Sequence, residues 1–568
     1  MTNEPSTVKK IKCILVDWGG VCCTNGEPFA NKEFQKALNK TPEEIANDVR
    51  ETYNGFYVGK FSTSDFWKKV LRKYGLTSFS AEDLSKSYLE SYTINQEMLA
   101  LISQLKKTFR VVLCSNLTPV MTEHIRRAHK TDDLFDKSFF SCYMGVMKPD
   151  KKYFDQVMRA EVLNPEECLF IDDSSKNIIA AREFGIDAIC YSDMSQLLLE
   201  LQSRGIHPIF LPNNHSKKEI AFKEVSHEEK QVVLGVLEKF GISCNRVEVI
   251  DLPAKNSKNF KIFSEKGLFF LRKYIGKTSI EQLQHSHEIF KFCAKNNCRV
   301  PALLSAKNGE TLTTVNDSLY AVFYFLEGTI YSGSAGELTA SAKSLAHLHK
   351  TLAHLPSSLI SELQKAPPPV YAGTIVSLDI LSTIKNSFGD STFDCVVKNL
   401  FPFFVELTRK YLAHQHTNEY LLQKQVIHSD VHPHNILITS SKSSNDPAAI
   451  ILDFDSMRWS ERARDVACAM HRLVRQQIVH EGIAKDVLVQ IRNACTNFLS
   501  AYESTLPLTS NEKRALPVLM LSELVQKIHF VLQEHYLQKN AKWDAELAKF
   551  IMLIDEVRMF EEALTKND

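Results

Sequence analysis

The chain of 568 residues lacks several features that would assign it to a special class of protein. Its 13 cysteines contain no C-x-x-C pair and their number is odd, which argues against a disulfide framework and favours reduced thiols in a cytoplasmic protein. It has a polar N-terminus and no run of about 20 apolar residues, so we expect neither a signal peptide nor a membrane partner. The net charge of +1, with lysine and arginine dispersed, makes nucleic acid a poor candidate partner.

The remaining composition is that of an ordinary globular protein. Apolar residues make up 44% of the chain and charged residues 24%. A chain of this length exceeds a single hydrophobic core, so we expect two or three domains. The stretch GIHPIFLPNNHSKKE, with its prolines, glycine and asparagines, predicts a linker over residues 206–225. It would separate a first domain, residues 1–205, from a second domain, residues 226–568.

The first domain contains four short apolar runs that lead into polar or acidic residues: IKCILVDW, FRVVLCSN, ECLFIDDS and DAICYS. Such runs are typical of buried parallel strands in an α/β fold whose carboxyl ends carry the chemistry. Residues 25–96, between the first two runs, have helical periodicity. We therefore predict a Rossmann-like core with a helical cap.

Four signals for phosphate chemistry fall at or just beyond the ends of predicted elements of this domain. They are Asp17, Ser115, Lys148 and the pair Asp172–Asp173. A single aspartate at the end of a strand is more often a cap or turn residue than a nucleophile. Together, however, the four signals supply a carboxylate nucleophile, a hydroxyl and an ammonium for the phosphoryl oxygens, and further carboxylates for Mg²⁺.

The motifs DWGGV, CSN, KPDKKYF and FIDDSSKNIIAAREFG, in this order, resemble the haloacid dehalogenase superfamily of phosphatases over about residues 10–205. The resemblance implies that Asp17 is the nucleophile and that Ser115 and Lys148 bind phosphate. It also implies that Asp17, Asp172 and Asp173 hold Mg²⁺ and that Asn116 contacts substrate or nearby backbone. Most of these phosphatases have an acid–base aspartate two residues after the nucleophile, where this chain has Gly19. The domain is therefore either a weakened phosphatase or a non-catalytic binding module.

The segment VIHSDVHPHNILI, followed by IILDFDS, is the most specific signal in the chain. It contains the frame H-x-D-x-x-x-x-N, with Asp430 and Asn435, and Asp453 follows 18 residues after the asparagine. Transfer of a phosphoryl group from ATP requires a carboxylate at the acceptor hydroxyl, and an asparagine and an aspartate for Mg²⁺. A zinc site formed by the nearby histidines is a weaker alternative, because other ligands at recognisable spacing are absent.

This second region resembles the aminoglycoside, choline and homoserine kinases, which share the two-lobed α+β protein-kinase fold. The resemblance implies an N-lobe over residues 226–328 and a C-lobe over residues 329–568. It makes Asp430 the catalytic base, Asn435 and Asp453 the metal ligands, and Asp455 a possible further ligand. Phosphate or nucleotide contacts are expected from a second group of residues: Ser257, Asn259, Arg272, Lys273 and Glu288. Arg272 and Lys273 are alternatives on one strand, Glu288 could pair with either, and residues 325–328 resemble the adenine hinge.

We therefore predict an ATP- and Mg²⁺-dependent kinase of a small-molecule alcohol, joined to a phosphatase-like domain. The same pair of modules resembles the N-terminal part of certain acyl-CoA dehydrogenases, which makes a hydroxy acid or its CoA ester one candidate acceptor. Homoserine-like, choline-like, sugar and antibiotic alcohols are others, because a fold does not select among them. A protein kinase is disfavoured, since no D-F-G or A-P-E motif can be placed. The sequence does not indicate an oligomeric state.

Overall fold

The computed structural model describes residues 11–209, 211, 221–251, 257–275, 279–365, 373–416, 422–441 and 444–565. The chain divides into two compact units, Met1–Asn214 and His215–Asp568. Each unit has its own sheet and its own buried core, and each is described by itself below.

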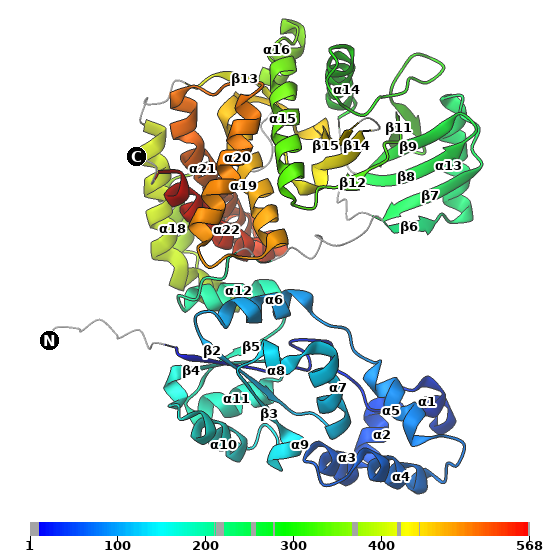
Figure 1. The fold of residues 1–568 in the computed structure, drawn as a ribbon, viewed down its shortest axis with the longest axis vertical. Coiled ribbons are helices and arrows are strands. Elements are labelled where there is room, and N and C mark those ends of the chain that lie inside the picture. The colour runs from blue at the N-terminus through cyan, green and yellow to red at the C-terminus, as the bar shows by residue number, and fades with distance from the viewer. Residues whose placement is uncertain are drawn as a thin grey trace, which may run out of the picture. The chain divides into compact units, whose positions relative to one another are not determined.

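The N-terminal unit is built on a five-stranded parallel sheet in the order β3-β2-β1-β4-β5. Its strands are β1 Cys13–Val16, β2 Arg110–Ser115, β3 Lys137–Phe140, β4 Cys168–Asp172 and β5 Asp187–Cys190. Helices α10 Lys151–Glu161 and α11 Ser175–Phe184 cover one face, and α6 Gln96–Leu105 and α12 Met194–Ser203 cover the other (Figure 1). Strands β2 and β3 lie on one side of β1, and the later strands β4 and β5 lie on the other. Because the strand order reverses at β1, a crevice is expected at its carboxyl end.

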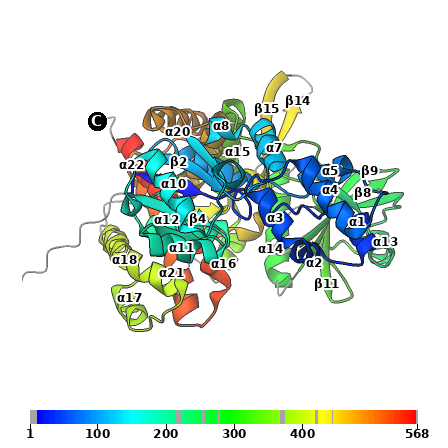
Figure 2. The ribbon, with the colours of Figure 1, turned by 90° about the horizontal axis from the view of Figure 1, so that it is seen from below.

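The predicted cap is a group of five helices between β1 and β2. They are α1 Lys32–Leu38, α2 Pro42–Asp48, α3 Arg50–Tyr57, α4 Thr63–Tyr74 and α5 Ala81–Leu89. Both ribbon views place them at one end of the unit, away from α10 and α11 (Figures 1 and 2). They have a separate aromatic core that includes Phe29, Phe34, Phe56, Phe66 and Trp67. The remaining short helices of the unit are α7 Pro119–His129, α8 Thr131–Leu134, α9 Ser141–Met144 and η1 Pro165–Glu167.

The C-terminal unit begins with a six-stranded antiparallel sheet in the order β10-β11-β9-β8-β7-β6. Its strands are β6 Ala221–Glu224, β7 Arg246–Asp251, β8 Ser257–Ser264, β9 Gly267–Tyr274, β10 Thr313–Val315 and β11 Ser318–Tyr324. Helices α13 His227–Lys239 and α14 Ile280–Lys295 complete this lobe. The tight β8–β9 hairpin turns at Gly267, whose φ of 116° only glycine adopts readily.

The second lobe is mainly helical. Its helices are α15 Ala335–Leu352, α16 Ser357–Lys365, α17 Leu378–Lys385, α18 Thr392–His416, α19 Arg462–Glu481, α20 Val487–Glu503, α21 Ser510–Tyr536 and α22 Asp544–Thr565, with η4 Ala541–Trp543. Two small sheets lie among them: β12 Thr329–Ile330 with β14 Ile436–Ser441 and β15 Ser444–Ile451, and β13 Lys424–Ile427 with β16 Arg458–Glu461. The two lobes together form the two-lobed architecture expected of a kinase-like fold.

Helix α21 is long and apolar enough to cross a membrane by length and composition, with a mean hydropathy of 1.4 over its best window. However, 61% of that window is buried inside the unit, where the helix packs against α19 and α22. Burial of this kind is typical of a core helix, so the apolar character of α21 is accounted for by packing.

Two details of the fold differ from the sequence-based expectation. Strand β6 lies within the predicted linker and pairs with β7, because Ala221–Glu224 can extend the sheet by one antiparallel strand. Strand β3, whose residues Lys137–Phe140 form a very short run, was not anticipated and occupies the edge beside β2. All 13 cysteines are free thiols in the structure.

Candidate active sites

Strand register brings the separate signals of the N-terminal unit to one edge of its sheet. Val16, the last residue of β1, pairs with Leu113 on β2 and with Ile171 on β4. The residues that follow these positions therefore emerge side by side. Asp17, Ser115 and Asp172 are all buried at this edge. Their proximity results from parallel pairing, since each lies at the carboxyl end of its strand.

Lys148 lies between the two aspartates. Its ammonium donates to Asp172 Oδ2 at 2.6 Å and to the Cys114 carbonyl at 2.7 Å, and lies 3.0 Å from Asp17 Oδ1. The Lys148 side chain has no exposed surface. Burial alone would lower the pKa of Lys148, but the carboxylates of Asp17 and Asp172 raise it. The lysine is therefore held as a cation at the point where a phosphoryl group would meet Asp17.

Asp17 is held by several groups at once. Oδ1 accepts the Trp18 backbone N–H at 2.7 Å, and the Ser115 hydroxyl also bonds to the carboxylate. Burial raises the pKa of Asp17 to about 7, and the Asp172 carboxylate adds to this effect, whereas Lys148 opposes it. A cation beside the carboxylate would stabilise its ionised, nucleophilic form.

Three carboxylates at this edge could hold a metal ion. Asp17, Asp172 and Asp173 each offer an oxygen, and these oxygens lie within 4.8 Å of one another. Within the described residues, no other group of three histidine, cysteine or acidic side chains converges in this way. An all-oxygen donor set is the kind that Mg²⁺ prefers, so the residues fit a magnesium site. Asp172 is fixed by Asn177 and by the Ser174 backbone N–H.

The side chain of Asn116 bonds to the backbone of Lys148. Its Nδ2 donates to the Lys148 carbonyl and its Oδ1 accepts the Lys148 N–H, both at 2.9 Å. This pair of bonds fixes the backbone that carries the buried ammonium. Asn116 therefore positions Lys148 in this structure, which matches the backbone alternative given above for this residue.

A cavity of about 420 Å³ opens in front of Asp17 and is lined by both core and cap residues. The cap contributes Tyr53, Tyr57 and Tyr88. Because the cap covers the reacting edge, it can exclude water and select the leaving group.

The second site depends on a loop between β13 and β14. The buried Asp465, on the first turn of α19, accepts the backbone N–H groups of His428 and Ser429, each at 2.9 Å. His349 donates to the same carboxylate at 3.0 Å, and its other ring nitrogen accepts from the Tyr502 hydroxyl at 2.7 Å. This network holds Ser429 at a φ of 72°. Asp465 is thus the anchor of the loop that presents Asp430.

Asp430 forms an ion pair that the sequence did not reveal. Arg472, about two helix turns beyond Asp465 on α19, donates to Asp430 Oδ1 at 3.0 Å and to Glu523 at 2.8 Å. Burial would raise the pKa of Asp430, but a bond from His432 and the charge of Arg472 hold it well below its usual range. The carboxylate therefore stays ionised and fixed in position.

A cavity of about 390 Å³ lies between the antiparallel sheet and this loop. Its walls are largely aromatic and aliphatic, with Phe270, Phe290, Phe323, Tyr324, Phe325 and Leu326 among the lining residues. Ser257, Asn259 and Arg272 line it as well, together with Asp430, Asn435, Asp453 and Asp455. Asn259 Oδ1 and Arg272 Nε are buried without a partner among the described residues. The apolar wall could pack against a base, Arg272 Nε–H could donate to a phosphate oxygen, and Asn259 Oδ1 could accept from a donor group of the ligand, so the cavity fits a nucleotide.

Arg272 connects this cavity to the predicted metal ligands. Its guanidinium donates to Asp453 at 3.1 and 3.3 Å and lies 3.1 Å from Asp455. Burial opposes ionisation of Asp453, but Arg272 lowers its pKa, whereas burial raises the pKa of Asp455 to about 6. Asn435 Nδ2 donates to the Asp430 carbonyl, which leaves its amide oxygen as a potential metal ligand.

Comparison with known proteins assigns a family to each domain. A family model described as haloacid dehalogenase-like hydrolase matches residues 11–185, and one described as phosphotransferase enzyme family matches residues 248–485. The chain joins a haloacid dehalogenase-like hydrolase domain to a kinase-like phosphotransferase domain. Enzymes of the first kind use Mg²⁺ and enzymes of the second kind use ATP. The resemblance of this pair of domains to the N-terminal part of certain acyl-CoA dehydrogenases stays a prediction.

Individual relatives match one domain each. A sesquiterpene phosphatase of Aspergillus oryzae is 26% identical over 192 residues, which are 34% of this chain and 95% of that protein. A hydroxylysine kinase of Bos taurus is 26% identical over 187 residues, 32% of this chain and 44% of that protein. A solved haloacid dehalogenase family enzyme of Bacteroides thetaiotaomicron, in complex with magnesium and inorganic phosphate, is 24% identical, with a TM-score of 0.30. It covers 33% of this chain and 98% of its own.

Two residues predicted for the phosphotransferase domain lie elsewhere. Lys273 faces away from Arg272, above the ring of Tyr320, because β9 is regular and alternate side chains point to opposite faces. Glu288 is on the solvent side of α14 and pairs with Lys291 at 2.8 Å. The neighbouring His287 takes the buried position instead and bonds to Thr311. Of the two alternatives on β9, Arg272 lines the cavity. The expected pairing of Glu288 with it was wrong, because Arg272 obtains its carboxylate partners from Asp453 and Asp455.

Part of the predicted phosphate loop, residues 252–256, lies outside the described residues. Arg472 and Asn25 are the functional candidates that sequence reasoning missed. No motif marks Arg472, which is one of several arginines on α19. The sequence signal for Asn25 is the pair Gly19–Gly20, because a side chain at position 19 would collide with the Asn25 amide.

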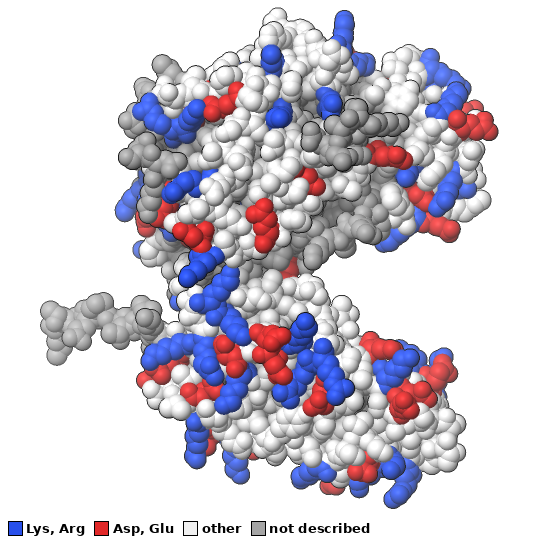
Figure 3. Space-filling model, in the orientation of Figure 1, with Lys and Arg blue, Asp and Glu red and all other residues white. Residues whose placement is uncertain are grey.

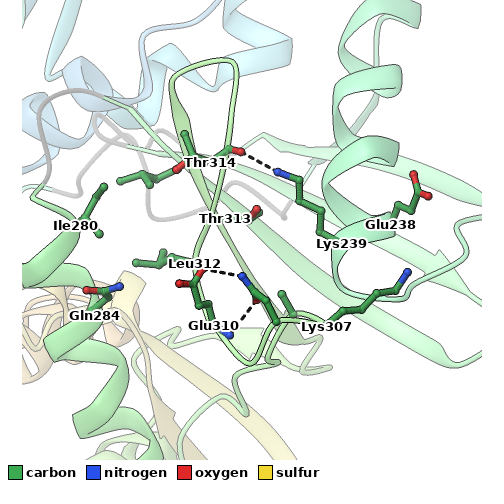
Figure 4. A pocket seen from close by; sticks show the side chains of 12 residues that line it. Glu238, Lys239, Ile280, Gln284, Lys307, Glu310, Leu312, Thr313 and Thr314 are labelled. Carbon is green, nitrogen blue, oxygen red and sulfur yellow. Dashed lines mark hydrogen bonds between the residues drawn. The ribbon is translucent and has the colours of Figure 1, made fainter.

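A further cavity of about 720 Å³ lies on the sheet lobe of the phosphotransferase domain (Figure 4). Lys239 crosses its wall to donate to the Thr314 carbonyl, and Asn308 bonds to Glu310. None of the proposed catalytic residues lines it. On the face shown in Figure 3, positive and negative side chains are interspersed on each domain, in keeping with the near-zero net charge.

Proposed function

We propose that the phosphotransferase domain transfers the γ-phosphoryl group of ATP to a hydroxyl of a small molecule. The observation that carries this proposal is the single cavity that brings together Asp430, Asn435, Asp453 and Arg272 beneath an apolar wall. Asp430, kept ionised by Arg472, accepts or orients the proton of the acceptor hydroxyl. Mg²⁺, held by Asn435 and Asp453 when bound, would offset the charge of the phosphates. Arg272 then exchanges its carboxylate partners for phosphate oxygens.

We propose that the hydrolase domain removes phosphoryl groups by way of Asp17. The convergence of Asp17, Asp172 and Asp173 supports this, as does the buried Lys148. Mg²⁺ held by these carboxylates would screen the nucleophile from the phosphate. A non-catalytic binding role is the alternative, and only the replacement at Gly19 favours it. The fully buried Lys148 favours the catalytic role, because its ammonium lies 3.0 Å from Asp17 Oδ1, where it would stabilise the charge of a phosphoryl group in transfer.

The acceptor of the kinase reaction is a small-molecule alcohol. A hydroxy acid or its CoA ester is one candidate, and homoserine-like, choline-like, sugar and antibiotic alcohols are others. We place the enzyme in the cytoplasm, acting without nucleic acid or a membrane.

Mass spectrometry of metabolite extracts incubated with the protein, ATP and Mg²⁺ tests the kinase. A new phosphorylated compound is expected with the wild type and not with Asp430→Asn, because the variant cannot accept the proton. If Asp430→Asn forms the compound at the wild-type rate, the assignment of the kinase site fails. The Asp17→Asn variant is the matched control, since it changes the other domain and leaves this product in place.

A phosphate-ester panel tests the hydrolase domain. Hydrolysis by the wild type and its loss in Asp17→Asn are expected. If neither protein hydrolyses any member above background, the domain is a binding module.

A further inference from the structure

The two glycines after Trp18 make room for two specific side chains. A Cβ atom at position 19 would lie 2.8 Å from Asn25 Oδ1. A Cβ atom at Gly20, which has a φ of +74°, would lie 2.0 Å from Asp173 Oδ2. Asn25 Nδ2 also donates to that Asp173 oxygen, at 3.2 Å. Because Gly19 and Gly20 have no side chains, Asn25 and Asp173 can approach each other beside them.

The carboxamide of Asn25 therefore fills the region into which a side chain at position 19 would extend. An amide donates and accepts hydrogen bonds but does not release or take up a proton near neutral pH. Asn25 can hold Asp173 in place, yet it cannot supply the acid–base step.

Only one other carboxyl lines this cavity among the described residues. Asp17 is the nucleophile and Asp173 a metal ligand, which leaves Glu27 as the remaining carboxyl among the described lining residues. Burial raises the pKa of Glu27, but its Oε1 accepts the Phe29 backbone N–H at 3.2 Å, which ties the carboxyl to its own loop. The cap tyrosines are weak acids, since burial raises the pKa of Tyr53 to about 12.

We propose that Asn25 replaces the missing side chain at Gly19 and that the hydrolase domain is thereby restricted to phosphoryl donors whose leaving group departs as a stable anion. Acyl phosphates, phosphoanhydrides and activated aryl phosphates belong to this class, and simple alkyl phosphates do not. The inference rests on the proposed phosphatase function and specifies its substrate class.

The chemistry balances without a protein acid. Asp17 Oδ attacks phosphorus, the bond from phosphorus to the leaving oxygen breaks, and the leaving group takes the electron pair as a carboxylate, phosphate or phenolate. Water then attacks the aspartyl phosphate, the bond to Asp17 breaks, and both protons of the water end on the released dihydrogen phosphate. The second step lacks a protein base and is therefore slow, so the aspartyl phosphate accumulates.

The test compares kcat/KM for acetyl phosphate, a series of aryl phosphates and an alkyl phosphate. The wild type is expected to favour the best leaving group over the alkyl phosphate by at least about 100-fold, since general acid catalysis commonly contributes 100- to 10,000-fold. The double variant Gly19→Asp/Asn25→Ala, which has both a carboxyl and the room for it, is expected to narrow this ratio by about 10-fold or more. Asn25→Ala alone is the matched control and is expected to change all substrates by a common factor.

Two further measurements do not depend on turnover. Rapid quenching and intact-mass spectrometry should detect close to one phosphoryl group per wild-type chain with acetyl phosphate and none on Asp17→Asn. The shift in melting temperature produced by Mg²⁺ with inorganic phosphate should persist in each Gly19 and Asn25 variant, which shows that the site is intact.

Equal rates for alkyl and activated phosphates in the wild type would overturn the inference and leave the phosphatase function standing. A loss of alkyl-phosphate hydrolysis in Glu27→Gln alone would also overturn it, because the proton would then come from Glu27. The absence of both hydrolysis and a phosphorylated Asp17 with every donor would instead overturn the phosphatase function itself.

Discussion

The two candidate active sites share one arrangement of charges but differ in how far it is buried. Each holds one cation between two carboxylates: Lys148 between Asp17 and Asp172, and Arg272 between Asp453 and Asp455. Lys148 is completely buried, whereas Arg272 is 16% exposed and its two partners are 36% and 32% exposed. The cation of the hydrolase site is therefore fully enclosed, whereas the charged cluster of the phosphotransferase site is partly exposed to its cavity.

This difference has a physical reason in the chemistry of the two side chains. A lysine ammonium is a compact charge that fits among three oxygens at the end of a parallel sheet. A guanidinium is a planar fork that contacts two carboxylates at once and later binds phosphate in the same manner. Removal of the cation should therefore have a larger effect on folding in the first domain than in the second.

Substitution of the buried cation should produce the largest effect. Lys148→Met leaves Asp17 facing Asp172 in a buried site, and we expect a loss of about 3–5 kcal/mol in the free energy of unfolding of the hydrolase domain. Hydrolysis should fall at least about 100-fold, since a charge that stabilises the transition state is lost. Urea unfolding and steady-state hydrolysis measure the two effects.

Arg272→Met is the matched variant in the other domain. Because its two partners are about one-third exposed, we expect a smaller loss of stability than in Lys148→Met. ATP-dependent phosphorylation should still fall strongly. Similar destabilisation of the two domains would contradict the contrast between a fully buried and a partly exposed cation.

Substitution of Asp465, which anchors the loop that carries Asp430, should have the next largest effect. Asp465→Asn removes one acceptor from the two backbone N–H groups of His428 and Ser429, and we expect a cost of about 1–3 kcal/mol together with a large loss of kinase activity. Asp394→Asn is the control, because Asp394 also accepts two backbone N–H groups, from Gly389 and Ser391. The control should lose stability and keep its activity. Activity lost equally in both variants would mean that Asp465 acts only through stability.

Arg472→Gln should have a more selective effect. We expect kcat of the kinase to fall about 10-fold, with the KM for ATP little changed, because Asp430 loses the charge-assisted bond that orients it. Arg464→Gln is the control on the same helix. The Arg464 guanidinium donates to Glu461 and Ser522, and its removal should leave kcat nearly unchanged. A rise in the KM for ATP without a change in kcat would show that Arg472 serves nucleotide binding.

Acid should destabilise the phosphotransferase domain by a smaller amount. Burial lowers the pKa of His287 and of His529 to about 4, below the value near 6.5 expected for the unfolded chain. The stability that these neutral rings contribute is therefore complete above pH 6.5 and is lost as the pH falls towards 4. We expect on the order of 1–2 kcal/mol for each histidine at pH 5, measured by calorimetry.

In His287→Asn, the stability of the phosphotransferase domain should depend less on pH than in the wild type. Substitution of the exposed His354 by asparagine should not change this dependence. An unchanged slope in His287→Asn would show that the ring does not stay neutral in the folded domain. The transition of the hydrolase domain serves as an internal reference in the same scan.

The sequence predicted the hydrolase site more completely than the phosphotransferase site. Asp17, Ser115 and Asp172 each follow an apolar strand, and parallel strands end at one edge, so their convergence could be foreseen. In the kinase-like lobe, Asp430, Asn435 and Asp453 were placed by their spacing. Glu288 was misplaced because one residue on a helix is a rotation of about 100°, and helical periodicity alone did not distinguish it from His287.

The sequence by itself determined the two domain types, the order of their motifs and which carboxylates are proposed to react. These depend on strand ends and on short loops, where local pattern and chemistry coincide. Only the tertiary structure decided which partners the charges have: Arg472 for Asp430, Asp453 and Asp455 for Arg272, and Asn25 in the space beside Gly19. Such partners are distant in the chain, and they are brought together by the packing of elements, which no local spacing records.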